Sequence, residues 1–206
     1  MKNKPEFPAS ILSLTVLCLF IAGTASAQTA REPVALSQDA PRNSKVTEVS
    51  ARIASMYGVD GQMVEDFVQA AVSLESRTGI AAPVVIAIAI HESGFNSYLF
   101  TNTGNPFGIK ASRPWTGPTF SMWHDGEETK FRVYGSAAEA VLDFGEFVHS
   151  RTWYADALAC PMDDYPCVID GLKKTENESG YSMNPQWDEG VLAVIEKAGL
   201  QDLAAR

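Results

Sequence analysis

The most restrictive feature of this sequence is an uninterrupted apolar run that ends in a carboxylate. Residues 84–90 are all apolar, and Glu92 stands two positions after the last of them. A segment that is apolar on every side must be buried on every side, so this run predicts the centre of the core. Pro83 suits the first turn of a helix, whereas the many β-branched residues are also compatible with a strand.

The position of Glu92 gives it a candidate chemical role. A carboxyl at the end of a buried segment, beside the chain break expected at Gly94, would border a cleft. Partial desolvation there would raise its pKa and keep it protonated near neutral pH. Protonation of a glycosidic oxygen requires such an acid. The competing interpretation is a glutamate at a helix end that merely faces solvent.

The N-terminus has the pattern of a cleaved secretory signal. Lys2 and Lys4 precede an apolar run over 11–22, and small residues follow at 25–27. We therefore predict removal of residues 1–27 and export, to the periplasm in the first place and to the medium in the second. A permanent N-terminal anchor is the alternative, although the run is short for a membrane span. We expect no stable membrane anchor in the mature chain.

The rest of the chain predicts a single, mainly α-helical domain with a small β-hairpin lobe. Residues 28–45 are polar and without period, and we predict a flexible segment there and a folded domain over 46–206. Apolar positions at helical spacing predict helices over 46–56, 64–79, 137–148, 153–159 and 187–198. Residues 95–118 read as irregular, and Asp125-Gly126 predicts the turn of a hairpin over 119–134. This is a lysozyme-like α+β layout.

Composition excludes several classes of ligand. The 206-residue chain has a formal net charge of −9, so it lacks the cationic surface that nucleic acids and anionic membranes select. His91, His124 and His149 have no metal-ligand spacing, and no phosphate-binding or dinucleotide motif occurs. We predict no metal and no cofactor.

Two cysteines remain after the predicted cleavage. Cys160 and Cys167 are closely spaced, and export would place them in an oxidising compartment. We predict a disulfide between them, with a pair of reduced thiols as the alternative.

Five short blocks resemble the bacterial glucosaminidase family, the peptidoglycan endo-β-N-acetylglucosaminidases that include the hydrolase domain of flagellar rod-associated proteins. The blocks follow the order of the family and span about residues 80–200: Ala82 to Phe95, Asn105-Pro106-Phe107-Gly108-Ile109-Lys110, Trp115-Thr116-Gly117-Pro118, Phe131 to Ser136, and Gly180-Tyr181-Ser182-Met183-Asn184-Pro185. The resemblance implies that residues 84–93 form a helix and that the hairpin lobe lies beside a catalytic cleft.

The resemblance also implies roles for individual residues. Glu92 matches the essential acid of the family, and Tyr181 matches a cleft tyrosine that positions substrate or assists catalysis. Residues that match the cleft floor, or that could bind sugar there, are Asn105, Phe107, Gly108, Lys110 and Trp115. The substrate implied is the glycan strand of peptidoglycan, cut at the β-1,4 bond after N-acetylglucosamine.

One expected group is missing. Family members often carry a second glutamate on the first hairpin strand, but residues 119–124 read Thr-Phe-Ser-Met-Trp-His. Glu127 and Glu128, past the turn, are the candidate general bases, although both could be ordinary turn carboxylates. Without a second carboxylate, the N-acetyl group of the substrate could assist hydrolysis.

Two other functions compete with the hydrolase. The segment 92–96 also resembles the catalytic motif of lytic transglycosylases, but their downstream Gly-Leu-Met-Gln is absent. The missing strand carboxylate is compatible with a non-catalytic peptidoglycan-binding or assembly factor. The expected partner besides peptidoglycan is a flagellar or secretion-system envelope complex.

Overall fold

The computed structural model describes residues 39–173 and 180–204. Its helices are α1 (Asp39–Tyr57), α2 (Gly61–Thr78), α3 (Ala82–Ser93), α4 (Tyr98–Thr103), α5 (Ala137–His149), α6 (Ala155–Ala159), α7 (Tyr165–Leu172) and α8 (Trp187–Ala198), with 3-10 turns η1 (Thr152–Tyr154) and η2 (Leu200–Leu203). Strands β1 (Thr119–His124) and β2 (Glu127–Arg132) form an antiparallel hairpin. The predicted mainly helical fold with a hairpin lobe is confirmed. The predicted signal segment lies outside the described residues.

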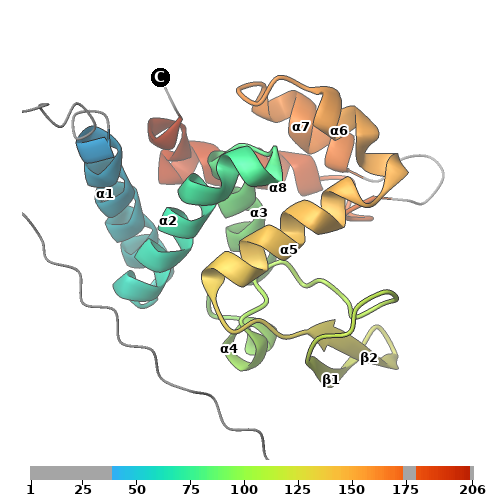
Figure 1. The fold of residues 1–206 in the computed structure, drawn as a ribbon. Helices are drawn as coiled ribbons and strands as arrows, with labels where there is room; N and C mark the ends of the chain where they lie inside the picture. The colour runs from blue at the N-terminus through green and yellow to red at the C-terminus, as the bar shows by residue number, and fades with distance from the viewer. Residues whose placement is uncertain (1–38, 174–179, 205–206) are drawn as a thin grey trace, which may run out of the picture. The chain divides into compact units, whose positions relative to one another are not determined.

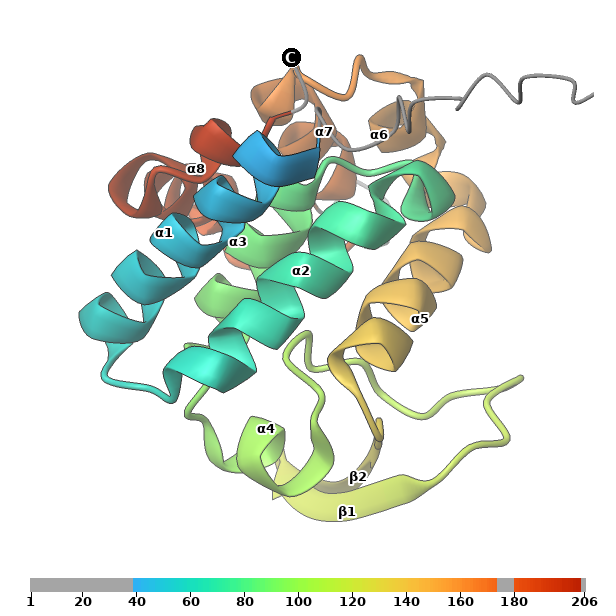
Figure 2. The ribbon, with the colours of Figure 1, turned by 60° about the vertical axis from the view of Figure 1, so that its left-hand side comes forward.

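Helix α3 forms the centre of the core. Every residue from Ala81 to Ile90 is buried, and α3 packs against α2, α7, α8 and η2. Both views show it enclosed by the other helices (Figures 1 and 2). Residues 82–93 form a helix and not a strand. The described sheet consists of two strands that pair with each other, so it offers this segment no partner strand. A buried helix satisfies its own backbone hydrogen bonds without a partner strand.

Both ends of α3 are fixed by specific contacts. Its N-terminus has no capping side chain of its own, and the Glu75 carboxylate on α2 accepts a hydrogen bond of 2.9 Å from the Ala82 N–H instead. Arg42 pairs with the second oxygen of Glu75 at 2.7 Å. At the other end, Gly94 adopts a left-handed conformation with φ of 55°, which glycine adopts without steric cost. The helix therefore ends directly after Glu92 and Ser93.

The hairpin and α4 lie together at one end of the helical body (Figures 1 and 2). Asp125 and Gly126 form the turn, both with positive φ, as the sequence predicts. Along β1 the side chains alternate between more and less exposed positions. Arg132, at the end of β2, donates two 2.7 Å bonds to Asp143 on α5, and this contact fastens the hairpin to the helices.

Several element boundaries differ from the sequence prediction. Helix α1 begins at Asp39, so residues 39–45, expected to be flexible, are helical. The segment expected to be irregular contains α4, whose first turn is capped by Ser97 and whose end is set by the left-handed Gly104. Helix α7 was not predicted. The sequence predicts Asn184 as the cap of the last helix, but Asn184 accepts a hydrogen bond from the Gln186 N–H and lies in a turn ahead of α8.

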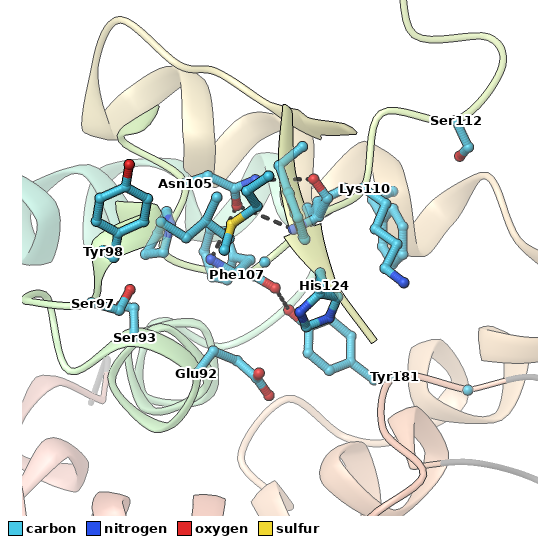
Figure 3. A pocket seen from close by; sticks show the side chains of 18 of the residues that line it. Glu92, Ser93, Ser97, Tyr98, Asn105, Phe107, Lys110, Ser112, His124 and Tyr181 are labelled. Carbon is cyan, nitrogen blue, oxygen red and sulfur yellow. Dashed lines mark hydrogen bonds between the residues drawn. The ribbon is translucent and has the colours of Figure 1, made fainter. Parts of the chain in front are cut away.

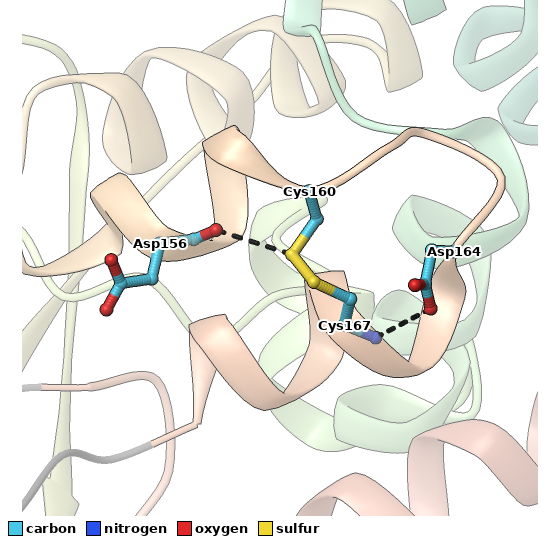
Figure 4. The surroundings of a disulfide bond; sticks show 4 residues. All are labelled: Asp156, Cys160, Asp164 and Cys167. Carbon is cyan, nitrogen blue, oxygen red and sulfur yellow. Dashed lines mark hydrogen bonds between the residues drawn. A yellow bond between two sulfur atoms is a disulfide. The ribbon is translucent and has the colours of Figure 1, made fainter.

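Cys160 and Cys167 form a disulfide, in agreement with the sequence prediction (Figure 4). The bond joins the end of α6 to the first turn of α7. Asp164 caps α7 by accepting a hydrogen bond from the Cys167 N–H. No helix in the described ranges is long and apolar enough to cross a membrane.

Candidate active site

A pocket of about 560 Å³ lies between the end of α3, the hairpin and the turn before α8. Its volume falls within the range of small-molecule sites. Figure 3 shows the side chains that line it. They come from segments that are far apart in sequence: Glu92, Ser93, Ser97, Tyr98, Leu99, the six residues 105–110, Ser112, Met122, His124, Phe131, Phe147, Tyr154, Gly180 and Tyr181.

Glu92 lies at the wall of this pocket, at the end of α3. Desolvation by the surrounding protein raises its pKa, while the hydrogen bond from Trp187 and the charge of His91 oppose the shift. The residue is nevertheless exposed by surface area, because its carboxyl opens into the pocket. Exposure and desolvation are compatible here, because water reaches a carboxyl at the wall of a pocket from one side only, while protein surrounds its other side. A carboxyl with a raised pKa can serve as a general acid.

Trp187 fixes the orientation of the Glu92 carboxyl. Its indole Nε1 donates a hydrogen bond of 2.7 Å to Oε1 of Glu92, and the indole itself is 1% exposed. With Oε1 engaged as an acceptor, Oε2 is the oxygen that can carry the proton toward a substrate. From the sequence, Trp187 is expected only to pack in the core, on the apolar face of the last helix. A buried indole N–H needs a hydrogen-bond acceptor, and this requirement could have indicated a contact with a polar group.

Close packing of α8 on α3 brings Trp187 within reach of Glu92. Gly190 lies one turn after Trp187, and a Cβ atom on it would lie only 2.4 Å from Cε1 of His91. A larger residue at this position would require the His91 imidazole to move.

Tyr181 lines the pocket beside Glu92, as the resemblance implies. Its hydroxyl donates a 2.7 Å hydrogen bond to the Phe107 carbonyl, and its ring packs on Trp187 with centroids 5.2 Å apart. Burial raises its pKa well above the usual value, and the charge of Glu92 adds to the shift. Tyr181 is thus a neutral hydrogen-bond donor that joins the turn before α8 to the cleft floor.

The cleft floor is built around a buried asparagine. Asn105 donates to the carbonyls of Ile109 and Arg132, and its Oδ1 accepts from the N–H groups of Phe107 and Ile109. The Phe107 ring stacks on Phe144 in the core, with centroids 4.4 Å apart. Asn105 and Phe107 line the pocket, but their contacts show that they shape its floor.

Gly108 and Lys110 also line the pocket. Gly108 has a φ of 65°, a left-handed conformation, and Lys110 is exposed at the pocket edge. Lys110 forms an isolated antiparallel β-bridge with Phe131 of β2, so the floor segment pairs with the hairpin at this point. The structure therefore brings four of the five predicted binding residues to the same pocket as Glu92.

Trp115, the fifth, lies at a different place. It lines a neighbouring pocket with Arg132 and Arg151. The Arg132 guanidinium lies 4.7 Å from the centre of its ring. A role for Trp115 in sugar binding stays a prediction.

The predicted general bases also lie outside the pocket lining. Glu127 and Glu128 are exposed on β2, opposite His124 and Trp123 in the hairpin. Among residues 39–173 and 180–204, Glu92 is the only carboxylate that lines the pocket. A role for Glu127 or Glu128 as base therefore stays a prediction. His124, considered above only as a metal ligand, does line the pocket.

The described part of the chain contains no group of three or more His, Cys, Asp or Glu side chains that could hold a metal ion.

Comparisons with known proteins agree with this geometry. Residues 68–200 match the Glucosaminidase family, described as mannosyl-glycoprotein endo-beta-N-acetylglucosaminidase. The chain is 27% identical to "Peptidoglycan hydrolase FlgJ" of Salmonella typhimurium over 134 residues, which cover 59% of this chain and 40% of the relative. The protein of the same name from Vibrio cholerae is 27% identical over 128 residues, covering 56% and 37%. The chain thus matches less than half the length of these relatives.

Solved structures share the fold at low identity. The peptidoglycan hydrolase from Sphingomonas sp. A1 superposes with a TM-score of 0.56 at 22% identity, covering 70% of this chain and 96% of that one. The glycoside hydrolase domain of Salmonella typhimurium FlgJ gives 0.54 at 23%, covering 68% and 88%. The catalytic domain of the autolysin Auto from Listeria monocytogenes gives 0.56 at 18%, covering 84% and 100%. With the family match spanning most of the folded domain, this chain belongs to the glucosaminidase family.

Proposed function

We propose that this chain is a peptidoglycan hydrolase that cleaves the β-1,4 glycosidic bond after N-acetylglucosamine, with Glu92 as general acid. The observation that carries the proposal is the Glu92 carboxyl at the wall of the pocket, with a raised pKa and one oxygen held by Trp187. Family membership supports the choice of a glycosidic bond. The names of the curated relatives support peptidoglycan as the polymer.

The pocket suits the first step of such a reaction. A sugar chain lying between α3 and the hairpin would bring a glycosidic oxygen to Oε2 of Glu92, which donates its proton as the C–O bond breaks. Tyr181 and Asn105 hold the floor against which the sugar would lie. Desolvation raises the pKa of Glu92 and so favours the protonated form that this step uses.

The test is digestion of purified peptidoglycan by the mature chain, with mass spectrometry of the products. We expect fragments with reducing N-acetylglucosamine ends, and at least about 100-fold less product with Glu92→Gln, since a general acid typically contributes 10² to 10⁴ in rate. Fragments with reducing N-acetylmuramic acid ends would place the cut at the other linkage and refute the bond specificity. No digestion by the unmodified chain would refute the hydrolase.

A lytic transglycosylase is the second candidate. The observation that favours it is that Glu92 is the only pocket carboxylate in the described part of the chain. A reaction in which a hydroxyl of the sugar itself attacks needs no base-activated water. Anhydro-muramic ends in the same digestion would establish this reaction and overturn the first proposal. A third outcome, wall binding with equal inactivity of the unmodified chain and Glu92→Gln, would point to a binding or assembly factor.

We also propose that the protein is exported and acts in the periplasm, on the basis of the N-terminal sequence pattern. N-terminal sequencing of the protein recovered from periplasmic extract tests this, and the expected mature start follows Ala27. A flagellar or secretion-system envelope complex is proposed as its partner. Deletion of the gene should then impair assembly of that complex, whereas an unaffected assembly would contradict the proposal.

A further inference from the structure

His124 occupies the side of the pocket that belongs to the hairpin. It is the last residue of β1 and lines the same pocket as Glu92 (Figure 3). Alternate side chains of a strand point to the same face, and Met122, two residues earlier, lines the pocket as well. Trp123, between them, is 73% exposed. The strand register therefore directs the imidazole toward the substrate space.

The imidazole is held by two neighbours. Its Nε2 lies 3.1 Å from Oδ2 of Asp125, and its ring meets Phe131 edge to face with centroids 5.4 Å apart. Asp125 lies in the hairpin turn with a φ of 52°, and its carboxylate contacts the preceding residue, His124. No described residue bonds Nδ1, so this nitrogen is the one available to a ligand or to water. An imidazole held by a carboxylate through one nitrogen can act as a base through the other.

The other side chains around the pocket do not supply a general base. Burial raises the pKa of Tyr154 and of Tyr181, so both hydroxyls act as hydrogen-bond donors. Glu92 is assigned as the acid. Glu127, across the hairpin from His124, and Glu128 are exposed and do not line the pocket. Within the described part of the chain, His124 is the only imidazole that lines the pocket, and a neutral imidazole has one ring nitrogen that can accept a proton.

We propose that His124 is the general base of the hydrolysis, in the place where a second carboxylate is usual, with Asp125 as its positioning residue. The inference rests on the proposed hydrolase function. The oxygen of a water molecule forms a bond to the anomeric carbon while the glycosidic C–O bond breaks. The proton of Glu92 passes to the departing oxygen, and a proton of the water passes to Nδ1 of His124. Exchange with solvent then restores both groups.

Substitution of His124 tests the proposal directly. His124→Gln retains a polar side chain of similar size but cannot accept a proton, and we expect kcat to fall about 100-fold or more with little change in KM. His124→Ala should lose as much, and added imidazole should restore part of its activity. Lys130→Gln, on the same hairpin and outside the pocket, is the matched control and should keep its activity.

Asp125→Asn tests the positioning role. The variant should keep KM and lower kcat less than His124→Gln does, because the imidazole remains but loses the carboxylate that lies 3.1 Å from its Nε2.

Several results would overturn the proposal. Activity of His124→Gln within about threefold of the unmodified protein would exclude a base, and so would a loss in His124→Ala that imidazole cannot restore. A loss of 100-fold in Glu127→Gln or Glu128→Gln, with His124→Gln active, would assign the base to the hairpin carboxylate. Proton nuclear magnetic resonance of the first-formed product gives a further criterion. Attack by water in a single step inverts the anomeric centre, so retention would contradict the scheme.

Failure of this inference is distinguishable from failure of the proposed function. If the unmodified protein digests peptidoglycan and Glu92→Gln does not, the hydrolase stands whatever the His124 variants do. If the unmodified protein yields anhydro ends or no product, the hydrolase itself fails, and the role of His124 as base fails with it.

Discussion

The indole Nε1 of Trp187 donates a hydrogen bond of 2.7 Å to Oε1 of Glu92, across 95 positions of sequence. This bond joins the first residue of α8 to the end of the central helix, and it acts against the desolvation that raises the pKa of Glu92. The carboxyl proposed as the acid is therefore held in one orientation by a residue of the core. Its pKa results from two opposing effects, burial and hydrogen bonding.

Replacement of the indole should change the pH dependence of activity. Trp187→Phe removes the donor that favours the charged carboxylate, so the pKa of Glu92 should rise further. The acid then stays protonated to higher pH, and the basic limb of the kcat/KM profile should move upward in pH. Loss of the bond and of buried volume should also destabilise the fold by about 1 to 3 kcal/mol. Trp123→Phe, at an exposed indole, is the control, and an unmoved limb in Trp187→Phe would contradict the assignment.

Neutralisation of Glu92 should not destabilise the protein at neutral pH. The folded-state pKa lies above the unfolded value, so stability is greatest below the unfolded pKa and falls as pH rises through the folded pKa. Glu92→Gln removes this titration. The difference in thermal midpoint between the variant and the unmodified protein should therefore become more favourable to the variant from pH 4 to pH 7.5. The opposite trend in thermal melts would show that the carboxylate is stabilised by its environment.

The Tyr181 hydroxyl supports the cleft floor. Tyr181→Phe leaves the Phe107 carbonyl without its donor, and we expect a loss of about 1 to 2 kcal/mol in unfolding free energy. Displacement of the floor should lower kcat by about 10- to 100-fold. Because the pKa of Tyr181 is well above its usual value, the shape of the pH profile should not change. Tyr165→Phe, half-buried and outside the pocket, is the control for both measurements.

Substitution in the Arg132–Asp143 pair should lower the free energy of unfolding strongly. Asp143 accepts two 2.7 Å bonds from Arg132 and one from the Tyr134 hydroxyl, and the Arg132 side chain is only 7% exposed. Asp143→Asn leaves a buried guanidinium without a counter-charge, which should cost about 3 kcal/mol in urea denaturation. The exposed Asp170→Asn should change stability by less than about 0.5 kcal/mol. Equal effects would show that the pair does not fasten the hairpin.

The disulfide should contribute to stability and not to chemistry. It closes a short loop, because Cys160 and Cys167 are separated by seven positions in sequence, and loop-closure entropy predicts about 2 kcal/mol for such a loop. The Cys160→Ser, Cys167→Ser double variant should lose about this amount while its kcat at 25 °C stays within about twofold of the unmodified protein. Reductant should destabilise the unmodified protein and leave the double variant unchanged. A large loss of kcat would show that α6 and α7 also shape the pocket.

Local sequence patterns determined most of the secondary structure. The apolar run before Glu92 and the Asp125-Gly126 turn each act within one element, so their physical effect can be predicted from neighbouring residues. Helix α4 is not predicted, because serine and glycine are also typical of irregular segments. In the structure Ser97 caps the start of this helix and Gly104 ends it.

The sequence also made Glu92 a candidate acid, through its position two residues after a fully apolar segment and its match to the acid of the glucosaminidase family. Only the tertiary structure decided what surrounds it. Trp187 reaches Glu92, Tyr181 reaches the Phe107 carbonyl, and Trp115 packs on Arg132 instead of lining the pocket. These contacts join segments tens of residues apart, and they depend on how helices and hairpin pack together. Periodicity along the chain reports which face of an element is buried, but not which distant residue meets it.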